Sequence, residues 1–156
     1  MPLEIDLSNE VAIVTGGASG IGAGISRALV QADAVVEGCD LSGGNGTSRL
    51  DVTDTQALAH FVEQVAARHG RIDIVVSCAR ANVFTGASDC GEADWERNQS
   101  LNLTSHWQLG RLCKPYLERD GKGVSLVCFS GKPVCSLLRF GNNVCHRRRA
   151  VCPHAG

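Results

Sequence analysis

Short apolar runs alternate with longer amphipathic stretches from about residue 11 to residue 130. The apolar runs predict strands over Val11 to Thr15, Ala34 to Cys39, Arg49 to Val52, Ile72 to Ser77 and Val124 to Phe129. The amphipathic stretches predict helices over about Gly20 to Gln31, Thr55 to His69 and Ala93 to Arg119. Alternating strands and helices build a parallel sheet covered on both faces, so the pattern predicts an α/β fold with a doubly wound parallel sheet.

The predicted helix over Thr55 to His69 has clear signals at both ends. Asp54 is a suitable N-cap, and Gly70 is the kind of residue at which a helix commonly stops. The apolar side chains of this helix fall on one stripe, formed by Ala57, Leu58, Phe61, Val62, Val65 and Ala66. The run Ile72 to Ser77 is almost continuously apolar, as expected for a strand that is buried on both faces of a sheet.

The regular pattern stops after Ser130. Residues 131–156 hold three cysteines and the run Arg147 to Arg149, and they show neither helical nor strand periodicity. We therefore expect a sheet truncated after about the fifth strand. In this prediction residues 1–130 form a nucleotide-binding domain, and residues 131–156 form an irregular Cys/Arg-rich tail outside its fold.

Composition and charge exclude several classes of function. The chain has 156 residues, enough for one domain with a sizeable core, and its net charge of −1 provides no field that attracts nucleic acid. No apolar run reaches the length of a membrane span, and the N-terminus lacks the features of a signal peptide. We therefore expect no nucleic-acid partner, no membrane and a cytoplasmic location. The eight cysteines are expected to be mostly reduced.

The segment Thr15 to Gly22 reads TGGASGIG and lies between a predicted strand and a predicted helix. Gly16 permits the chain reversal, Gly20 permits close approach of a pyrophosphate, and Gly22 permits close packing of the helix on the strand. The N–H groups of the first helical turn then face the phosphates. Asp40 ends the next apolar run, near the interval expected for a carboxylate that binds a ribose 2′-OH. These residues predict a dinucleotide site.

Together these motifs resemble the short-chain dehydrogenase/reductase family over about Leu7 to Ser130. The TGxxxGIG signature is complete, and Asp51 to Asp54 (DVTD) is similar to the family's DVxD segment, whose aspartate lies against the adenine. Asn102 lies in a segment similar to the one whose asparagine joins the family's proton relay. Gly123 to Ser130 (GVSLVCFS) resembles the strand that ends on the catalytic serine. The resemblance implies a Rossmann-like fold.

The resemblance also implies a cofactor and the residues that hold it. An acid at Asp40 implies NAD rather than NADP, because a carboxylate repels the 2′-phosphate of NADP. The implied cofactor-binding residues are Gly16, Ser19, Gly20, Ile21, Gly22, Asp40, Leu41, Asp51, Val52, Cys78 and Ala79. The implied catalytic residues are Ser130 and Asn102, and the resemblance implies no metal ion. The implied reaction moves hydride between NAD and a small alcohol, sugar or carbonyl substrate.

One departure from the family lies after the fourth predicted strand. The family's NNAG is Ser77, Cys78, Ala79 and Arg80 in this chain, so only the alanine is kept. Arg80 brings a bulky side chain to a place where backbone normally lies close to the cofactor. Two outcomes follow from this position: the side chain reaches a phosphate, or it obstructs the site.

A second departure affects the chemistry. In the family a tyrosine exchanges the proton with the substrate oxygen, and a lysine four residues later lowers the pKa of that tyrosine. The only tyrosine here is Tyr116, which precedes Ser130 and is followed four residues later by Asp120. Residues 142–147, where the pair is expected, read NNVCHR. We therefore expect an NAD-dependent oxidoreductase of this family that is catalytically impaired, or alternatively a non-catalytic NAD-binding module or a truncated gene product.

Three interpretations of residues 131–156 remain open. The loss of pattern favours a shift of the coding frame soon after Ser130. A metal site is the second, with Cys135, Cys145, His146, Cys152 and His154 as its ligands, although no C-x₂-C pair occurs. The third is a basic partner-binding tail around Arg139 and Arg147 to Arg149. With the sheet ending at its fifth strand, we expect an exposed apolar edge, and a family-type tetramer is doubtful.

Overall fold

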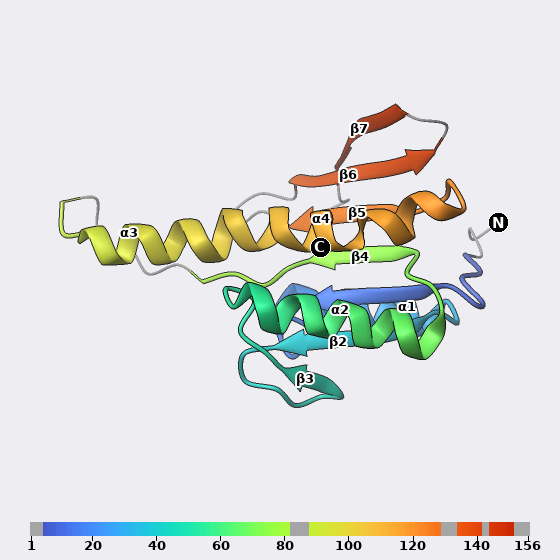
Figure 1. Ribbon diagram of the computed structural model, residues 1–156, viewed down its shortest axis with the longest axis horizontal. Coiled ribbons are helices and arrows are strands. Elements are labelled where there is room, and N and C mark those ends of the chain that lie inside the picture. The colour runs from blue at the N-terminus through green and yellow to red at the C-terminus, as the bar shows by residue number, and fades with distance from the viewer. Residues whose placement is uncertain (1–4, 82–87, 129–133, 142–143, 152–156) are drawn as a thin grey trace.

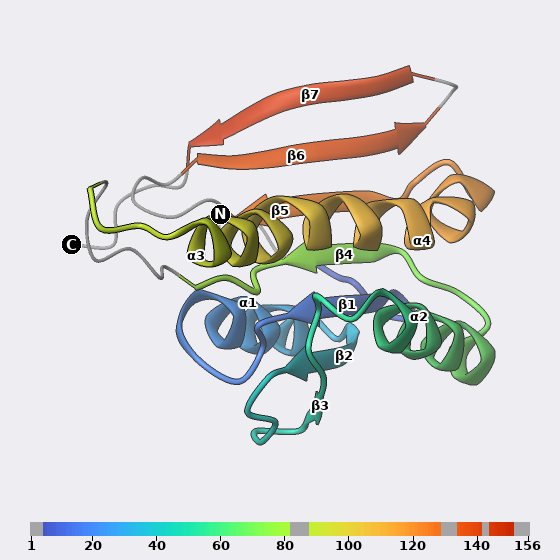
Figure 2. The ribbon, with the colours of Figure 1, turned by 60° about the vertical axis from the view of Figure 1, so that its left-hand side comes forward.

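The computed structural model describes residues 5–81, 88–128, 134–141 and 144–151, with side chains described as far as Cys128. In this part of the chain, seven strands form one sheet in the order β3-β2-β1-β4-β5-β6-β7 (Figures 1 and 2). The strands are β1 (Val11–Thr15), β2 (Val35–Asp40), β3 (Thr47–Arg49), β4 (Ile74–Ser77), β5 (Val124–Cys128), β6 (Val134–Gly141) and β7 (Val144–Val151). The helices are α1 (Gly20–Gln31), α2 (Thr55–His69), α3 (Glu92–Gln99) and α4 (Ser105–Arg119), with a π-helical turn η1 (Ser100–Thr104) between α3 and α4.

Strands β1 to β5 are parallel, which confirms the predicted Rossmann-like α/β architecture. Strand order reverses at β1, because β2 and β3 lie on one side of it and β4 and β5 on the other. Thr15, the last residue of β1, is level with Cys39 in β2 and with Ser77 in β4. The carboxyl ends of these strands therefore meet at one edge, which is where open α/β sheets bind their ligands.

Helices cover both faces of the sheet. α2 and α4 pack together on one face, and α1 packs on the other (Figures 1 and 2). On the face of α2 and α4 the core consists of buried apolar side chains, among them Ile13, Leu58, Phe61, Val62, Ile72, Leu109 and Leu117. Both predicted ends of α2 are confirmed: the Asp54 carboxylate accepts hydrogen bonds from the N–H groups of Gln56 and Ala57, both at 3.0 Å, and Gly70 has a φ of 74°.

Two elements differ from their predicted bounds by more than a shift of one or two residues at one end or both. The third strand is Thr47–Arg49, not Arg49 to Val52. The apolar character of Leu50 and Val52 instead serves the core, since Val52 is buried in the loop that leads to α2. The helix predicted over Ala93 to Arg119 is present as α3, η1 and α4, with a one-turn π-helix that no sequence period indicates.

The parallel part of the sheet ends at its fifth strand, β5, as expected, and two antiparallel strands extend the sheet within the segment that was expected to be an irregular tail. β6 pairs antiparallel with β5, from Val124 opposite Arg139 to Cys128 opposite Cys135, and β7 pairs antiparallel with β6. The expected exposed edge of β5 is therefore covered. Strand pairing satisfies backbone N–H and C=O groups and does not require alternating apolar and polar side chains. The pattern of apolar residues therefore did not predict β6 and β7. β7 is the outermost strand on this side of the sheet.

None of the helices in the described residues combines the length and the apolarity needed to cross a bilayer.

Candidate functional site

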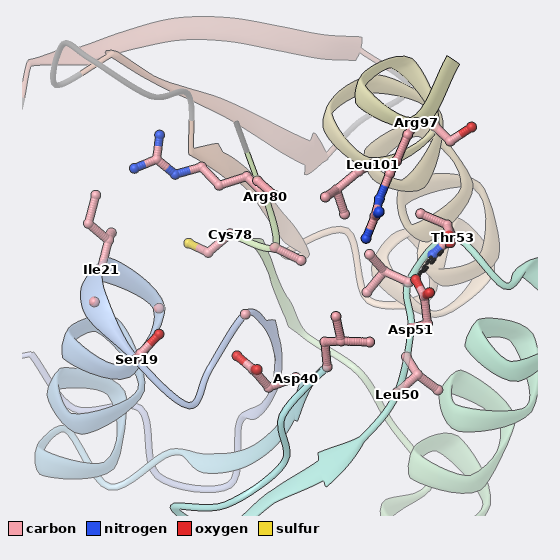
Figure 3. A pocket seen from close by; sticks show the side chains of 18 residues that line it. Ser19, Ile21, Asp40, Leu50, Asp51, Thr53, Cys78, Arg80, Arg97 and Leu101 are labelled. Atoms are coloured by element: carbon pink, nitrogen blue, oxygen red, sulfur yellow. Dashed lines mark hydrogen bonds between the residues drawn. The ribbon is translucent and has the colours of Figure 1, made fainter. Parts of the chain in front are cut away.

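A cleft of about 600 Å³ lies at the carboxyl ends of β1, β2 and β4. The loop after β1 forms one wall, the residues after β2 and β3 form a second, and the residues after β4 meet α3 and η1 on the third side (Figure 3). The structure brings all the implied cofactor-binding residues to this cleft: Gly16, Ser19, Gly20, Ile21, Gly22, Asp40, Leu41, Asp51, Val52, Cys78 and Ala79. Segments from four parts of the chain thus converge on one surface.

The glycine loop leaves no room for side chains at two of its positions. A Cβ on Gly22 would lie 2.1 Å from the carbonyl oxygen of Gly16, and a Cβ on Gly16 would lie 2.8 Å from the backbone nitrogen of Ala79. Gly16 also has a φ of 67°, which glycine adopts without strain. These two glycines hold the first turn of α1 close to β1 and to the segment after β4.

Gly20 has the opposite surroundings. Its added Cβ would meet no atom within 4 Å, and Gly20 lines the cleft at the N-terminus of α1. A ligand can therefore approach the backbone here, at the positive end of a helix whose first turn contains no acidic residue. Ser19, the N-cap residue, makes no side-chain capping bond, so its hydroxyl is available to the same ligand. This cradle fits the phosphates of a dinucleotide.

The carboxylate of Asp40 is fixed at the end of β2. It accepts hydrogen bonds from the Ser42 N–H at 3.0 Å, the Ser42 hydroxyl at 2.8 Å and the Ala18 N–H at 3.2 Å. Partial burial acts to raise the pKa of Asp40, but the hydrogen bonds from Ser42 and Ala18 outweigh it and lower the pKa below the usual value. Asp40 is therefore ionised near neutral pH and is oriented beside the glycine loop.

Asn45 forms a second link to the glycine loop that the sequence analysis missed. Its side-chain amide donates to the Ala18 carbonyl at 2.7 Å. Asn45 has a φ of 50° and precedes Gly46, and this Asn-Gly pair is a turn signal in the sequence.

Asp51 lies on the cleft wall opposite α1 (Figure 3). Its carboxylate accepts hydrogen bonds from the N–H of Thr53 at 2.9 Å and from the Thr53 hydroxyl at 2.7 Å. These bonds fix the turn that leads into α2. The remaining acceptor capacity of the carboxylate can serve an exocyclic amine of a bound base.

The floor of the cleft is formed by Cys78 and Ala79. The hydroxyl of Thr15 accepts hydrogen bonds from the N–H groups of both residues, each at 3.2 Å, so the end of β1 holds the segment after β4. The Sγ atoms of Cys78 and Cys128 lie 2.9 Å apart, which places the end of β5 next to this floor. Thr15 was part of the predicted motif, but its supporting role came only with the structure.

The two implied catalytic residues have different outcomes. Asn102 lies in η1, and its side-chain amide donates to the Ala81 carbonyl at 2.8 Å and to the Asn98 amide oxygen at 3.2 Å. A π-helical turn at such a position is common at functional sites. Ser130 lies outside the described residues. Tyr116 is partly buried, packs against the core and does not line the cleft.

A polar pair, of which Ser77 is buried and His106 partly buried, lies one helical turn beyond Asn102. The Ser77 hydroxyl, at the end of β4, is hydrogen-bonded to His106 Nδ1. Burial lowers the pKa of His106, which favours its neutral form. The histidine lies on the side of α4 that faces the end of β4, and no sequence motif indicated it.

Two arginines line the cleft, and only Arg80 had been singled out from the sequence. Arg80 follows the floor segment and Arg97 comes from α3 (Figure 3). Among the described residues, no cluster of histidine, cysteine or acidic side chains could hold a metal ion. The tail cysteines and histidines considered as metal ligands have no described side chains, so that alternative stays a prediction.

Comparison with known proteins agrees with this geometry. A family model described as short chain dehydrogenase matches residues 10–132, so β6 and β7 lie beyond the match. The D-threitol dehydrogenase of Mycolicibacterium smegmatis is 34% identical over 113 residues, which cover 63% of this chain and 44% of that protein. The 7alpha-hydroxysteroid dehydrogenase of Escherichia coli is 30% identical over 139 residues, which cover 80% of this chain and 54% of that protein. The chain thus spans about half the length of these curated relatives.

A solved structure shows the same arrangement of strands and helices. The crystal structure of a hydroxysteroid dehydrogenase from Escherichia coli superposes with a TM-score of 0.69 at 29% identity, and the match covers 81% of this chain and 57% of that one. The two proteins therefore share their fold over most of this chain.

Proposed function

The chain belongs to the short-chain dehydrogenase family, and from this membership we propose that it binds NAD in the cleft at the carboxyl ends of β1, β2 and β4. The observation that carries the proposal is the convergence of the glycine cradle with the fixed carboxylate of Asp40. The cradle suits the diphosphate, and the carboxylate suits the adenosine ribose.

Asp40 supports a preference for NAD over NADP. Its lowered pKa keeps it negatively charged, and two of its hydrogen bonds come from Ser42, which fixes its direction. A ribose 2′-OH can donate to this carboxylate, whereas a 2′-phosphate brings a like charge against it. Asp51 and Val52 line the neighbouring wall, and we assign them to the adenine.

When bound, the cofactor supplies the hydride chemistry of the family's oxidoreductases. The chain's own residues supply binding and orientation. The first turn of α1 and Ser19 hold the phosphates, Asp40 holds the ribose, and Cys78 and Ala79 support the cofactor from below. Asn102 is assigned to the relay beside the cleft and Ser130 to the substrate oxygen, and an alcohol, sugar or carbonyl compound is the proposed substrate class.

The chain is proposed to be catalytically impaired. A phenol has an unperturbed pKa of about 10, so proton exchange near neutral pH needs a neighbouring cation. No Tyr-x-x-x-Lys occurs in this sequence, and Tyr116 packs against the core away from the cleft. Binding and turnover are therefore expected to separate in this chain.

That separation favours a second candidate function, a non-catalytic module that binds NAD. Both candidates require Asp40, but only the enzyme requires Ser130. Equilibrium titration with NAD beside a turnover assay on a panel of sugars and secondary alcohols distinguishes them. NAD binding with no turnover supports the module, turnover that is lost in Ser130→Ala supports the enzyme, and absence of NAD binding refutes both.

The remaining expectations complete the proposal. Residues 1–130 are proposed as the nucleotide-binding domain, with β6 and β7 as an addition outside the family's fold. A family-type tetramer is not expected, and size-exclusion chromatography with light scattering tests this. A cytoplasmic location is tested by fractionation of cells that express the chain.

A further inference from the structure

We propose that Arg80 binds the diphosphate of the dinucleotide through its guanidinium and thereby determines the affinity of the cleft for phosphate-containing ligands. The inference rests on the proposed function, because it assigns a residue to the same site. It also answers the question raised by the sequence, where this arginine either reaches a phosphate or obstructs the cofactor.

The first observation is that Arg80 is available to a ligand. In the part of the chain that the structure describes, its guanidinium makes no hydrogen bond or ion pair, and its side chain is exposed. Other arginines do have partners: Arg68 bonds to Glu37 at 2.8 Å, and Arg71 bonds to Asp73 at 2.7 Å. A guanidinium that lines a cleft without a carboxylate partner is prepared to bind an anion.

The second observation is the direction of the side chain. Figure 3 shows Arg80 extending over Cys78 toward Ile21, in the first turn of α1, and away from Asp40. The side chain therefore reaches over the end of the cleft where the helix N–H groups are exposed. It leaves open the space between Asp40 and the glycine loop, so it does not obstruct the proposed ribose site.

The third observation is the distribution of charge. Asp40 and Asp51 lie on the wall formed by the ends of β2 and β3, whereas Arg80 and Arg97 come from the opposite wall. The N-terminal turn of α1 contains no acidic residue that would compete for Arg80. A ligand that matches this cleft carries hydroxyl groups that face the acidic wall and negative charge that faces Arg80. A ribose with a diphosphate has this arrangement.

The chemistry of arginine suits this role. Its planar fork donates two parallel hydrogen bonds to phosphate oxygens, and it stays charged at all working pH values. Arg80 can add this bidentate contact to the backbone N–H groups of α1, which approach from the other side of the diphosphate. Arg97 points toward the wall of Asp51 and Thr53 (Figure 3), so we assign the diphosphate contact to Arg80 alone.

The test compares ligands with and without phosphate. Wild type, Arg80→Gln and Arg80→Gly are titrated calorimetrically with NAD, ADP and adenosine at low and at high ionic strength. We expect both variants to bind NAD and ADP about 10-fold more weakly than wild type at low ionic strength, with no change for adenosine. Added salt should weaken wild type more than the variants, because it screens the lost charge pair.

Matched controls separate a specific contact from a general effect of charge. Arg111→Gln removes an arginine that lies over Trp107 on α4, outside the cleft, and should leave all three affinities unchanged. Arg97→Gln removes a charge within the cleft and should affect ADP less than Arg80→Gln does. Thermal melts of every variant verify that each one is folded.

Several results overturn the inference. Unchanged binding of ADP by Arg80→Gly would show that the arginine makes no contact with the diphosphate, and tighter binding would show that it obstructs the cleft. An equal loss of ADP affinity in Arg97→Gln would show that the positive charge of the cleft matters and not a specific contact of Arg80. Each of these results leaves the proposed function standing if wild type binds NAD. A wild-type chain that binds neither NAD nor ADP refutes both proposals, whereas one that binds ADP through Arg80 but does not bind NAD refutes only the proposed function.

Discussion

The Asp40 carboxylate accepts a hydrogen bond from the backbone N–H of Ala18, 22 residues earlier in the chain, at 3.2 Å. The Asn45 side chain donates to the carbonyl of the same Ala18 at 2.7 Å. Asp40, at the end of β2, and Asn45, in the loop after β2, therefore bind both the N–H and the C=O of Ala18 in the glycine loop. Asp40 has two roles in consequence: it fixes the loop, and it presents charge to the cleft.

The two roles of Asp40 can be separated by substitution. Asp40→Asn keeps an oxygen that accepts from Ala18 but removes the charge that repels a 2′-phosphate. We expect the ratio of NADP affinity to NAD affinity to rise by about 10-fold, in keeping with the strength of hydrogen bonds and repulsions that involve charged groups. Parallel calorimetric titrations with the two cofactors measure the ratio.

Asn45→Ala is the matched control for this experiment. It removes the other link to Ala18 without changing any charge in the cleft. We expect it to weaken NAD and NADP equally, so that the ratio stays at the wild-type value. If Asp40→Asn does not change the ratio of NADP affinity to NAD affinity, the assignment of Asp40 to the ribose is wrong.

Gly22 and Gly24 provide a paired test of the glycine cradle. Both lie in α1, but a Cβ on Gly22 would be 2.1 Å from the Gly16 carbonyl oxygen, whereas a Cβ on Gly24 would meet only the flexible end of Arg27, at 3.9 Å. Gly22→Ala is expected to lower the free energy of unfolding by about 1–3 kcal/mol through overpacking. Gly24→Ala is expected to raise it by about 0.5–1 kcal/mol, because alanine is the better helix former.

Urea unfolding of the two variants and wild type measures these differences. NAD titration of the same samples should show a loss of affinity in Gly22→Ala only. Equal stability of the two variants would mean that α1 does not pack against the glycine loop as described.

The sequence was sufficient for the parts of the site that depend on backbone conformation. The sequence allowed separate roles for Gly16, Gly20 and Gly22, because the absence of a Cβ affects only the immediate surroundings of each residue. The structure shows that these three surroundings differ. The position of Asp40 followed from the strand that it ends. Local features of this kind can be predicted from the sequence without knowledge of the contacts between distant segments.

Other parts of the site depend on contacts between distant segments, which periodicity does not encode. Arg97 lines the cleft because α3 continues the line of α4 past the carboxyl ends of the parallel strands (Figure 1), and Thr15 supports Cys78 from 63 residues away. The pairing of β6 with β5 is likewise a matter of backbone hydrogen bonds between segments without alternating side chains. Each of these features requires the fold before it can be seen.

His106 should make stability depend on pH. Burial lowers its pKa below the usual value, so the unfolded chain binds a proton at this residue more readily than the folded chain does. Stability from the neutral histidine is therefore complete above the unfolded pKa of about 6.5 and is lost as the pH falls below it. We expect the melting temperature of wild type to fall between pH 7.5 and pH 5.5 by several degrees, about the effect of 1 kcal/mol.

His106→Gln isolates this contribution from the other histidines of the chain. The substitution removes the hydrogen bond between His106 and Ser77. We expect the variant to be less stable than wild type at neutral pH and to have a flatter dependence of stability on pH. Melting curves at a series of pH values measure both effects. A variant whose profile is as steep as that of wild type would place the pH dependence elsewhere.

The hairpin of β6 and β7 is the part of the fold that the sequence least suggested, and Leu137→Pro tests it. Leu137 lies in the middle of β6, opposite Leu126 of β5 and Arg148 of β7, so it occupies a strand with neighbours on both sides. Proline there removes a backbone donor and disrupts the ladder, and it lowers the free energy of unfolding by about 3 kcal/mol if the hairpin unfolds together with the rest of the domain.

The edge of β5 would then be open to pairing between molecules. We expect a lower melting temperature and an increase in light scattering, whereas Arg148→Ala on the outer strand should change the free energy of unfolding by less than about 0.5 kcal/mol. A Leu137→Pro variant that melts and scatters like wild type would show that β5 does not depend on the hairpin for its edge.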